Sequence, residues 1–173
     1  MKIYLIGFMG CGKTTVGKLL AAHFSFDFID LDNHIETEYG KSISKIFETE
    51  NEVRFRKLET TYLNKISSKD NRVIATGGGT PCYNQNIEFI NKNGISVYLK
   101  MSSDNLFDRL KNEKNNRPLL KNLSDIDFKK YILEKLIERE SYYLQANHII
   151  SIENRSVEKI ISLLSEKINF ISK

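Results

Sequence analysis

Short apolar runs alternate along the chain with longer stretches whose apolar residues recur at helical spacing. Five short runs have the apolar, β-branched character of buried strands. They cover Ile3–Ile6, Phe26–Asp30, Arg72–Thr76, Ile95–Lys100 and His148–Ile152. Helical patterns occupy Lys13–His23, Glu52–Ile66, Asn84–Asn93, Asp104–Lys111, Asp125–Ala146 and Ser156–Ile168. Because alternating strands and helices form parallel sheets covered on both faces, the pattern predicts an α/β fold, a three-layer αβα sandwich with a central five-stranded parallel sheet.

Two segments interrupt this alternation of strand and helix. One is 33–51, which holds short helical pieces around Gly40, and the other is the polar stretch 112–124. In an open α/β sheet, ligands bind beyond the carboxyl ends of the strands, so segments inserted there are candidates for a substrate-binding subdomain and a lid. The sequence has no internal repeat and no interdomain linker, so we expect residues 1–173 to form one domain.

Composition narrows the class of protein without naming a ligand. The chain has 173 residues, of which 40% are hydrophobic, enough for a core of its own. Its net charge of +4 is too small to indicate a nucleic-acid binder. The chain has no run of about 18 apolar residues, so the sequence does not predict a membrane-spanning helix. Cys11 and Cys82 fit no disulfide or metal-ligand spacing. We therefore expect a cytoplasmic protein with free thiols that binds neither nucleic acid nor membrane.

The strongest motif follows the first predicted strand. Residues 7–14 read G-F-M-G-C-G-K-T, which matches the phosphate-binding loop G-x-x-x-x-G-K-[ST] in its required place between a strand and a helix. Glycines let successive N–H groups face one phosphate, and Lys13 can then reach the β- and γ-phosphates. The hydroxyl of Thr14 is suited to a Mg²⁺ ion bridging them. The alternative, an ordinary glycine-rich turn, is disfavoured because Lys13 and Thr14 are both in register.

Two carboxylates follow the second predicted strand and suggest an alcohol acceptor. A GTPase would need N-K-x-D, and the segment 91–94 reads N-K-N-G. In an extended chain alternate residues project to one side, so Asp30 and Asp32 are predicted to face one cleft. One could orient the water ligands of Mg²⁺, and the other could accept the proton of an attacking hydroxyl. In the alternative interpretation, one of the two carboxylates, for example Asp32, only caps the helix that begins near Asn33.

Three further features are ambiguous one by one. Gly77–Gly79 follow the third predicted strand, where they permit close approach of a ligand or form a flexible turn. Arg56 and Glu59 are spaced to pair across one helical turn, which is also typical of a solvated helix face. Arg117 and Arg139 would each, taken alone, be ordinary surface residues.

Taken together and in order, these motifs resemble shikimate kinase over almost the whole chain. The matching segments are the phosphate loop continued through Thr15 to Gly17, Asp30-x-Asp32, Phe55-Arg56-x-x-Glu59, Gly77–Gly79, Arg117-Pro118-Leu119-Leu120 and Arg139-x-x-x-Tyr143. The resemblance implies a nucleoside-monophosphate-kinase-like P-loop fold with strand order 2-3-1-4-5. It also implies a substrate-binding segment at about 31–60 and a lid at about 112–124. The implied reaction is Mg²⁺-dependent transfer from ATP to the 3-hydroxyl of shikimate, a step of chorismate and aromatic amino-acid biosynthesis.

The resemblance also assigns roles to individual residues. Catalytic roles fall to Lys13, Asp32 and Arg117, and Mg²⁺ binding to Thr14 and Asp30. Nucleotide contacts fall to Gly10, Cys11, Gly12, Lys13, Thr14, Thr15, Arg109, Arg117 and Arg155. Shikimate contacts fall to Asp32, Arg56, Gly77, Gly78, Gly79 and Arg139, with Glu59 holding Arg56 and with Phe47 and Phe55 forming an aromatic wall. At position 51 this chain has asparagine where the family pattern more often has glycine.

Two rival functions remain open at this level. One is another small-molecule P-loop kinase, for example one resembling a gluconate or nucleotide kinase, which would not need the Arg56 and Arg139 pair. The other is a nucleotide-binding regulatory protein without turnover, which the full set of catalytic positions disfavours. The resemblance favours a monomer whose partners are the small molecules ATP and shikimate.

Overall fold

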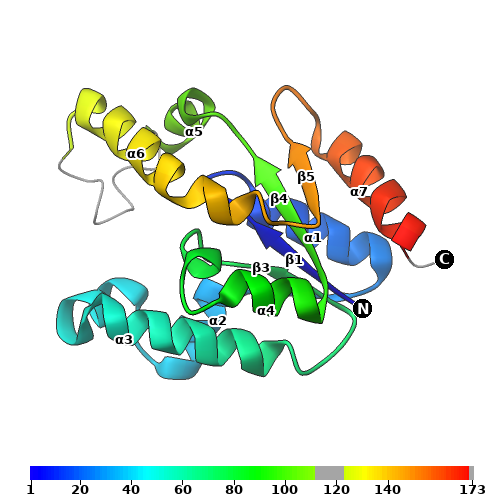
Figure 1. The fold of residues 1–173 in the computed structure, drawn as a ribbon, viewed down its shortest axis with the longest axis horizontal. Helices are drawn as coiled ribbons and strands as arrows, with labels where there is room; N and C mark the ends of the chain where they lie inside the picture. Colours follow the sequence, from blue (N-terminus) through cyan, green and yellow to red (C-terminus); the bar gives the residue numbers. More distant parts are fainter. Residues whose placement is uncertain (112–122, 172–173) are drawn as a thin grey trace.

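A five-stranded parallel sheet forms the centre of the computed structural model, which describes residues 1–111 and 123–171 (Figure 1). The strands are β1 (Lys2–Ile6), β2 (Asp27–Asp30), β3 (Arg72–Ala75), β4 (Ile95–Lys100) and β5 (His148–Ser151). β1 pairs with β3 on one side and with β4 on the other, and the spatial order is β2-β3-β1-β4-β5. The predicted strand order is confirmed, and every strand end lies within one residue of its predicted position.

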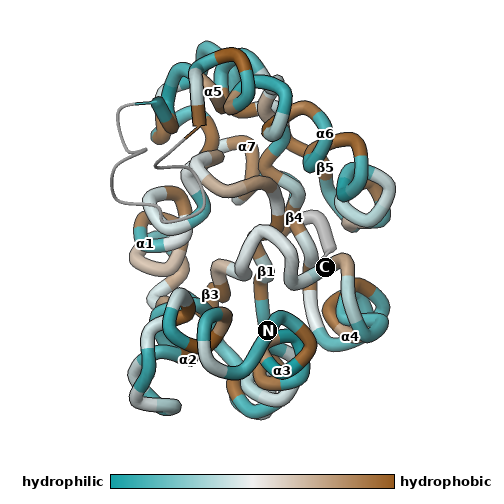
Figure 2. The backbone as a smooth tube through the Cα atoms, turned by 90° about the vertical axis from the view of Figure 1, so that its left-hand side faces the viewer, coloured by the Kyte–Doolittle hydropathy of each residue, from teal (hydrophilic) through white to brown (hydrophobic). Residues whose placement is uncertain are grey.

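Helices cover both faces of the sheet, which confirms the three-layer arrangement (Figures 1 and 2). Figure 2 shows hydrophobic stretches among β1, β3 and β4 and hydrophilic residues on the surrounding helices. Helices α1 (Lys13–Phe24) and α7 (Val157–Ile171) contact each other on one face, and α4 (Asn86–Asn93) and α6 (Asp125–Tyr143) cover the other. The remaining helices are α2 (Leu31–Tyr39), α3 (Ile43–Ile66), α5 (Ser103–Leu110) and a short 3₁₀ turn, η1 (Thr80–Cys82). Within the described part of the chain, none of these helices has the length and apolar character to cross a membrane.

Close packing of α1 on the sheet fixes the start of that helix. A Cβ atom at Gly17 would lie only 2.4 Å from Cε2 of Phe28 and 3.2 Å from Cδ1 of Leu5. Such a separation leaves no room for a side chain, so the helix backbone lies directly against β1 and β2. The loop between β1 and α1 is therefore anchored at both ends by buried structure.

The segment predicted to interrupt the alternation forms two helices joined by a turn. Gly40, with φ 74°, ends α2 in the left-handed region, and the Ser42 side chain caps the start of α3. The helix predicted from Glu52 begins earlier, at Ile43, because α3 continues through a break at Asn51. There φ is 72° and ψ is 170°, a region that is almost exclusive to glycine. Asn51 compensates in part, since its Oδ1 accepts a hydrogen bond from the N–H of Arg54 at 3.1 Å.

Replacing Asn51 by glycine is expected to stabilise the protein. The backbone conformation at Asn51 costs on the order of 1–3 kcal/mol for a residue with a side chain, whereas exchanging an asparagine cap for glycine costs only a few tenths of a kcal/mol. The relief of strain is the larger effect. A net gain of about 1 kcal/mol, near the lower end of this range, should raise the melting temperature of Asn51→Gly by roughly 2–4 °C in a domain of this size. Thermal denaturation of the two proteins measures this difference.

Asn51→Ala is the matched control, since alanine loses the cap and keeps the strain. Its melting temperature should fall below that of the unmodified protein. A glycine variant that melts at or below the alanine variant would show that the cap, and not the backbone conformation, dominates at this position.

Candidate active site

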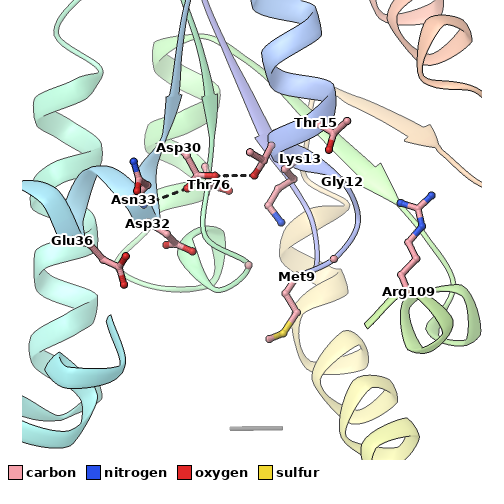
Figure 3. A pocket seen from close by; sticks show the side chains of 13 residues that line it. Met9, Gly12, Lys13, Thr15, Asp30, Asp32, Asn33, Glu36, Thr76 and Arg109 are labelled. Atoms are coloured by element: carbon pink, nitrogen blue, oxygen red, sulfur yellow. Dashed lines mark hydrogen bonds between the residues drawn. The ribbon is translucent and has the colours of Figure 1, made fainter. Parts of the chain in front are cut away.

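A cleft of about 620 Å³ opens at the carboxyl ends of β1, β2 and β3. This is the edge at which open parallel sheets bind ligands. Figure 3 shows Asp32 and Glu36 on one side of the cleft, Arg109 on the opposite side and Lys13 between them. The lining residues are Met9, Gly10, Gly12, Lys13, Thr14, Thr15, Asp30, Asp32, Asn33, Glu36, Thr76, Gly78 and Arg109.

The loop between β1 and α1 has the geometry of an anion site. Gly10 and Gly12 have φ values of 78° and 91°, which residues with side chains rarely adopt, and Gly12 directly precedes α1. The ammonium of Lys13 is buried against the loop, where its Nζ donates to the carbonyl oxygens of Gly7 at 2.8 Å and Phe8 at 2.9 Å. The Cys11 side chain is buried, so this residue could contact a nucleotide only through its backbone.

Thr14 and Asp30 lie in direct contact at the base of the cleft. The hydroxyl of Thr14 donates to Oδ2 of Asp30 at 2.8 Å. Both groups are hard oxygen donors, and Mg²⁺ is typically held by one or two such groups together with substrate phosphates and water. The pair therefore fits a Mg²⁺ ion placed next to the phosphate loop.

The structure corrects the reasoning that placed Asp30 and Asp32 on one side of an extended chain. β2 ends at Asp30, and Asp32 already belongs to the first turn of α2. The alternative that one of the two carboxylates caps this helix is confirmed for Asp30, which accepts from the N–H of Asn33 at 3.4 Å, and is wrong for Asp32. Both carboxylates nevertheless line the same cleft, since the helix starts where the strand ends.

The pKa of Asp32 is raised to about 7. Burial is the largest cause, the negative charges of Glu59 and Asp30 add to it, and the positive charges of Lys13 and Arg56 offset it in part. Asp32 and Glu59 approach each other across Gly77, where an added Cβ would lie 2.7 Å from one carboxylate and 2.8 Å from the other. A carboxylate whose pKa is near neutrality is a better proton acceptor at pH 7 than an ordinary aspartate. The environment of Asp32 thus suits a general base.

Arg56 is held by two carboxylates of its own helix. Its NH1 donates to Glu59 at 2.8 Å, which is the predicted pair, and its Nε and NH2 donate to Oε1 of Glu52 at 3.2 and 3.0 Å. Glu59 is fully buried and also accepts from the hydroxyl of Thr80 at 2.5 Å. Because a guanidinium carries five N–H groups and the described residues accept from three of them, two are left for a ligand in this part of the structure.

Arg139 approaches the glycine loop from α6, opposite Arg56. Only 8% of Arg139 is exposed, and its Nε has no hydrogen-bond partner among the described residues. An added Cβ at Gly78 would lie 3.5 Å from NH1 of Arg139, and one at Gly79 would lie 2.7 Å from both terminal nitrogens of Arg56. Two guanidinium groups thus lie against one glycine pair, and a buried, partly unpaired guanidinium is suited to binding an anion.

Of the remaining predicted site residues, some lie at the cleft and others do not. Arg109 lines the cleft beside the phosphate loop, 3.6 Å from an added Cβ at Gly12. Arg155 donates to the carbonyl of Ser151 at 2.8 Å and does not line the cleft. Arg117 and most of the predicted lid lie outside the described residues. Phe47 and Phe55 lie in contact, with ring centroids 4.9 Å apart, as a wall would require.

Sequence reasoning missed several residues that shape the site. They are Met9, Asn33, Glu36 and Thr76, which line the cleft, and Glu52, Thr80 and Tyr83, which surround Arg56 or its partner Glu59. Glu52 and Arg56 have the i, i+4 spacing of a helical ion pair, a signal that was present in the sequence.

The strand order, the phosphate loop and the acidic cleft together place this chain in the class of P-loop kinases. The shikimate kinase family model matches residues 9–169. A shikimate kinase from Azobacteroides pseudotrichonymphae is 44% identical over 168 residues, covering 96% of this chain and 99% of that protein. The chain belongs to the shikimate kinase family.

Solved structures agree with this assignment. The crystal structure of shikimate kinase from Bacteroides thetaiotaomicron has a TM-score of 0.93 at 38% identity, with 98% of each chain covered. A shikimate kinase from Acinetobacter baumannii, solved in complex with shikimate, has a TM-score of 0.89 at 36% identity, with 99% of this chain and 95% of that chain covered.

Proposed function

We propose that this enzyme transfers the γ-phosphoryl group of ATP to the 3-hydroxyl of shikimate, giving shikimate 3-phosphate and ADP in aromatic amino-acid biosynthesis. Family membership supports the reaction. The observation in this chain that carries the proposal is the pair Arg56 and Arg139 against Gly78 and Gly79. Two guanidinium groups beside a cleft with a basic carboxylate match an acceptor that carries both a carboxylate and a hydroxyl.

The phosphate loop would hold the nucleotide. Its N–H groups and Lys13 would bind the phosphates, and Arg109 would flank the adenine. Thr14 and Asp30 would bind Mg²⁺, which supplies positive charge to the β- and γ-phosphates. To exchange its two carbonyl partners for phosphate oxygens, the Lys13 ammonium needs only a local movement, because both carbonyls belong to the loop.

Asp32 would act on the acceptor. Its carboxylate would orient the shikimate hydroxyl and accept the hydroxyl proton as the oxygen attacks phosphorus. We further propose that 31–60 binds shikimate, that Arg117 in a lid at 112–124 contacts the phosphates, and that the enzyme is a cytoplasmic monomer. These extensions rest on the family resemblance.

An acceptor panel tests the proposed function. ADP release should be rapid with shikimate and near background with gluconate and nucleoside monophosphates. Comparable turnover with gluconate or a nucleotide would replace the proposed acceptor, and ATP binding without turnover of any acceptor would indicate a regulatory protein.

Arg56→Lys is expected to weaken shikimate binding although the charge is kept. An ammonium cannot make the parallel hydrogen bonds of a guanidinium, so the loss should be roughly 1.5–3 kcal/mol, or about 10- to 150-fold. Arg139→Lys should have a similar effect, and ATP affinity should barely change in either variant. Titrations with shikimate and with an ATP analogue measure both values.

Arg54→Lys is the control for this pair of variants. Arg54 lies two residues from Arg56 on α3, is half-exposed and pairs with Glu50 away from the glycine loop. Its replacement should leave both affinities unchanged. If Arg56→Lys and Arg139→Lys weakened both ligands equally, the effect would be a general loss of structure, and if neither weakened shikimate, the carboxylate clamp would be wrong.

A further inference from the structure

We propose that Tyr143 is a positioning residue, whose hydroxyl holds the Gly78–Gly79 peptide so that the Gly79 N–H faces the carboxylate of the acceptor. This inference rests on the proposed function and adds to it a residue that need not touch substrate. Tyr143 lies on α6, 65 positions along the chain from Gly78, and its hydroxyl donates to the Gly78 carbonyl at 2.5 Å.

The glycine loop requires such an anchor from outside. Gly77, Gly78 and Gly79 have no side chains with which to fix their own peptide planes. A side chain has no room there, because an added Cβ would lie 2.7 Å from Asp32 at Gly77, 3.2 Å from the backbone nitrogen of Met9 at Gly78 and 2.7 Å from Arg56 at Gly79. Within the loop, the N–H of Thr80 bonds to the carbonyl of Gly77 at 3.2 Å, and Cys82 bonds back to Gly79 at 2.9 Å. Neither bond fixes the peptide that joins Gly78 to Gly79.

The peptide geometry links Tyr143 to the ligand. In a trans peptide the C=O and N–H groups point in opposite directions, so a carbonyl held toward Tyr143 directs the Gly79 N–H away from it. Gly79 is buried, and across the described residues its N–H has no acceptor. Buried N–H groups without a partner are rare in folded proteins, so this donor is suited to a ligand. A hydrogen bond accepted by the carbonyl also polarises the N–H of the same peptide.

Tyr143 is itself rigidly placed. Its side chain has no exposed surface, and its ring packs on Tyr98 of β4 with centroids 5.1 Å apart. Burial raises the pKa of the Tyr143 hydroxyl, which therefore remains a donor at every pH of interest. Arg139 precedes Tyr143 by four positions, so one face of α6 brings both the guanidinium and the peptide anchor to the same loop.

Tyr143→Phe tests the proposal because it removes one oxygen atom and keeps the ring. We expect the KM for shikimate to rise about tenfold while the KM for ATP stays within a factor of about two. The informative readout compares shikimate with its neutral methyl ester, using dissociation constants from calorimetry. The preference of the enzyme for the acid over the ester should fall about tenfold, equivalent to about 1.4 kcal/mol, because the lost N–H contact is stronger with a charged carboxylate.

Tyr98→Phe is the matched control, since it also removes a buried hydroxyl from the same ring pair. Within the described part of the chain that hydroxyl has no hydrogen-bond partner, so the preference for the acid should not change. A purely structural role for Tyr143 would weaken acid and ester equally, and an unchanged preference would overturn the proposal. Because the Tyr143 hydroxyl also interacts with Arg139, the comparison is repeated in an Arg139→Lys background, where a fall in preference that disappears would assign the effect to Arg139 and overturn the proposal. If the ester binds too weakly to measure, equal rises in the KM values for shikimate and ATP would overturn it instead.

The unmodified enzyme separates this inference from the proposed function. Without turnover of shikimate by the unmodified enzyme, both the proposed function and the role of Tyr143 fail. With such turnover and an unchanged preference in Tyr143→Phe, only the role of Tyr143 fails.

Discussion

Lys13→Ala is expected to lower kcat by roughly 10³-fold or more while the fold persists. Removing a single neutral donor from a site that stabilises developing charge costs about 10²–10³-fold, and Lys13 contributes a full charge in a buried position. The charge matters most as negative charge shifts toward the leaving oxygen, so the loss should appear in the chemical step rather than in the KM for shikimate.

Structural consequences of this change should be small. Lys13 makes hydrogen bonds only within its own loop, to Gly7, Phe8 and the Cys11 sulfur, as far as the described residues show. Single-turnover kinetics and thermal denaturation, run side by side, measure the two effects. Lys18→Ala is the control, because Lys18 is an exposed cation on the same helix outside the main cleft. Turnover near that of the unmodified enzyme would remove Lys13 from the catalytic machinery.

The phosphate loop was predictable because its chemistry is local. Eight consecutive residues provide the turn, the lysine and the hydroxyl, and the neighbouring strand and helix have clear hydrophobic patterns. The bend within α3 was not predictable in detail. Helical periodicity continues on both sides of Asn51, and only the torsion angles reveal that the chain leaves the helix there.

The anchors of the glycine loop show the limit of sequence reasoning more sharply. Tyr143 and Gly78 lie 65 positions apart, and nothing in either local sequence pairs a tyrosine hydroxyl with that one carbonyl. Thr80 and Glu59 meet across 21 positions in the same way. Arg139 looked like an ordinary surface residue from its own helix, and only the tertiary packing buries it beside the loop.

The placement of Asp32 was predicted for an incorrect reason. Alternation along an extended chain was the argument, whereas the chain becomes helical at Leu31, directly after the predicted end of the strand at Asp30. The prediction that Asp30 and Asp32 line one cleft is nevertheless confirmed, because helix α2 starts at the carboxyl edge of the sheet and its first turn faces the phosphate loop. The start of a helix is difficult to locate from sequence when one acidic residue, here Asp30, is both the last strand residue and the helix cap.

Asp32→Asn is expected to reduce turnover by roughly 10² or more while shikimate binding changes only a few-fold. Asparagine keeps the shape and can hydrogen-bond the acceptor, but it cannot take a proton. Because the Asp32 pKa is about 7, kcat/KM for shikimate in the unmodified enzyme should fall about tenfold per pH unit below pH 7. The residual activity of Asp32→Asn should lack this dependence. Full turnover in the variant would exclude a general base at this position.

The same pKa predicts that Asp32→Asn is more stable than the unmodified protein above pH 7. An unfolded aspartate ionises near pH 4, whereas folded Asp32 ionises near pH 7, so the folded state binds the proton more tightly and ionisation works against folding. This destabilisation is absent below pH 4, grows as pH rises from 4 to 7 and is constant above. Melting temperatures of the two proteins should therefore converge at pH 4 and separate in favour of Asp32→Asn at pH 8.

Equal melting temperatures at pH 8 would mean that the cleft does not disfavour the charged form of Asp32. The pKa of Asp32 would then not be raised to neutrality, and the argument that this carboxylate is an effective base at pH 7 would fail. If Asp32→Asn gains stability and loses turnover, the charge of Asp32 lowers the stability of the folded protein and is needed for catalysis. Asp32 would then be a single residue at which stability and activity oppose each other.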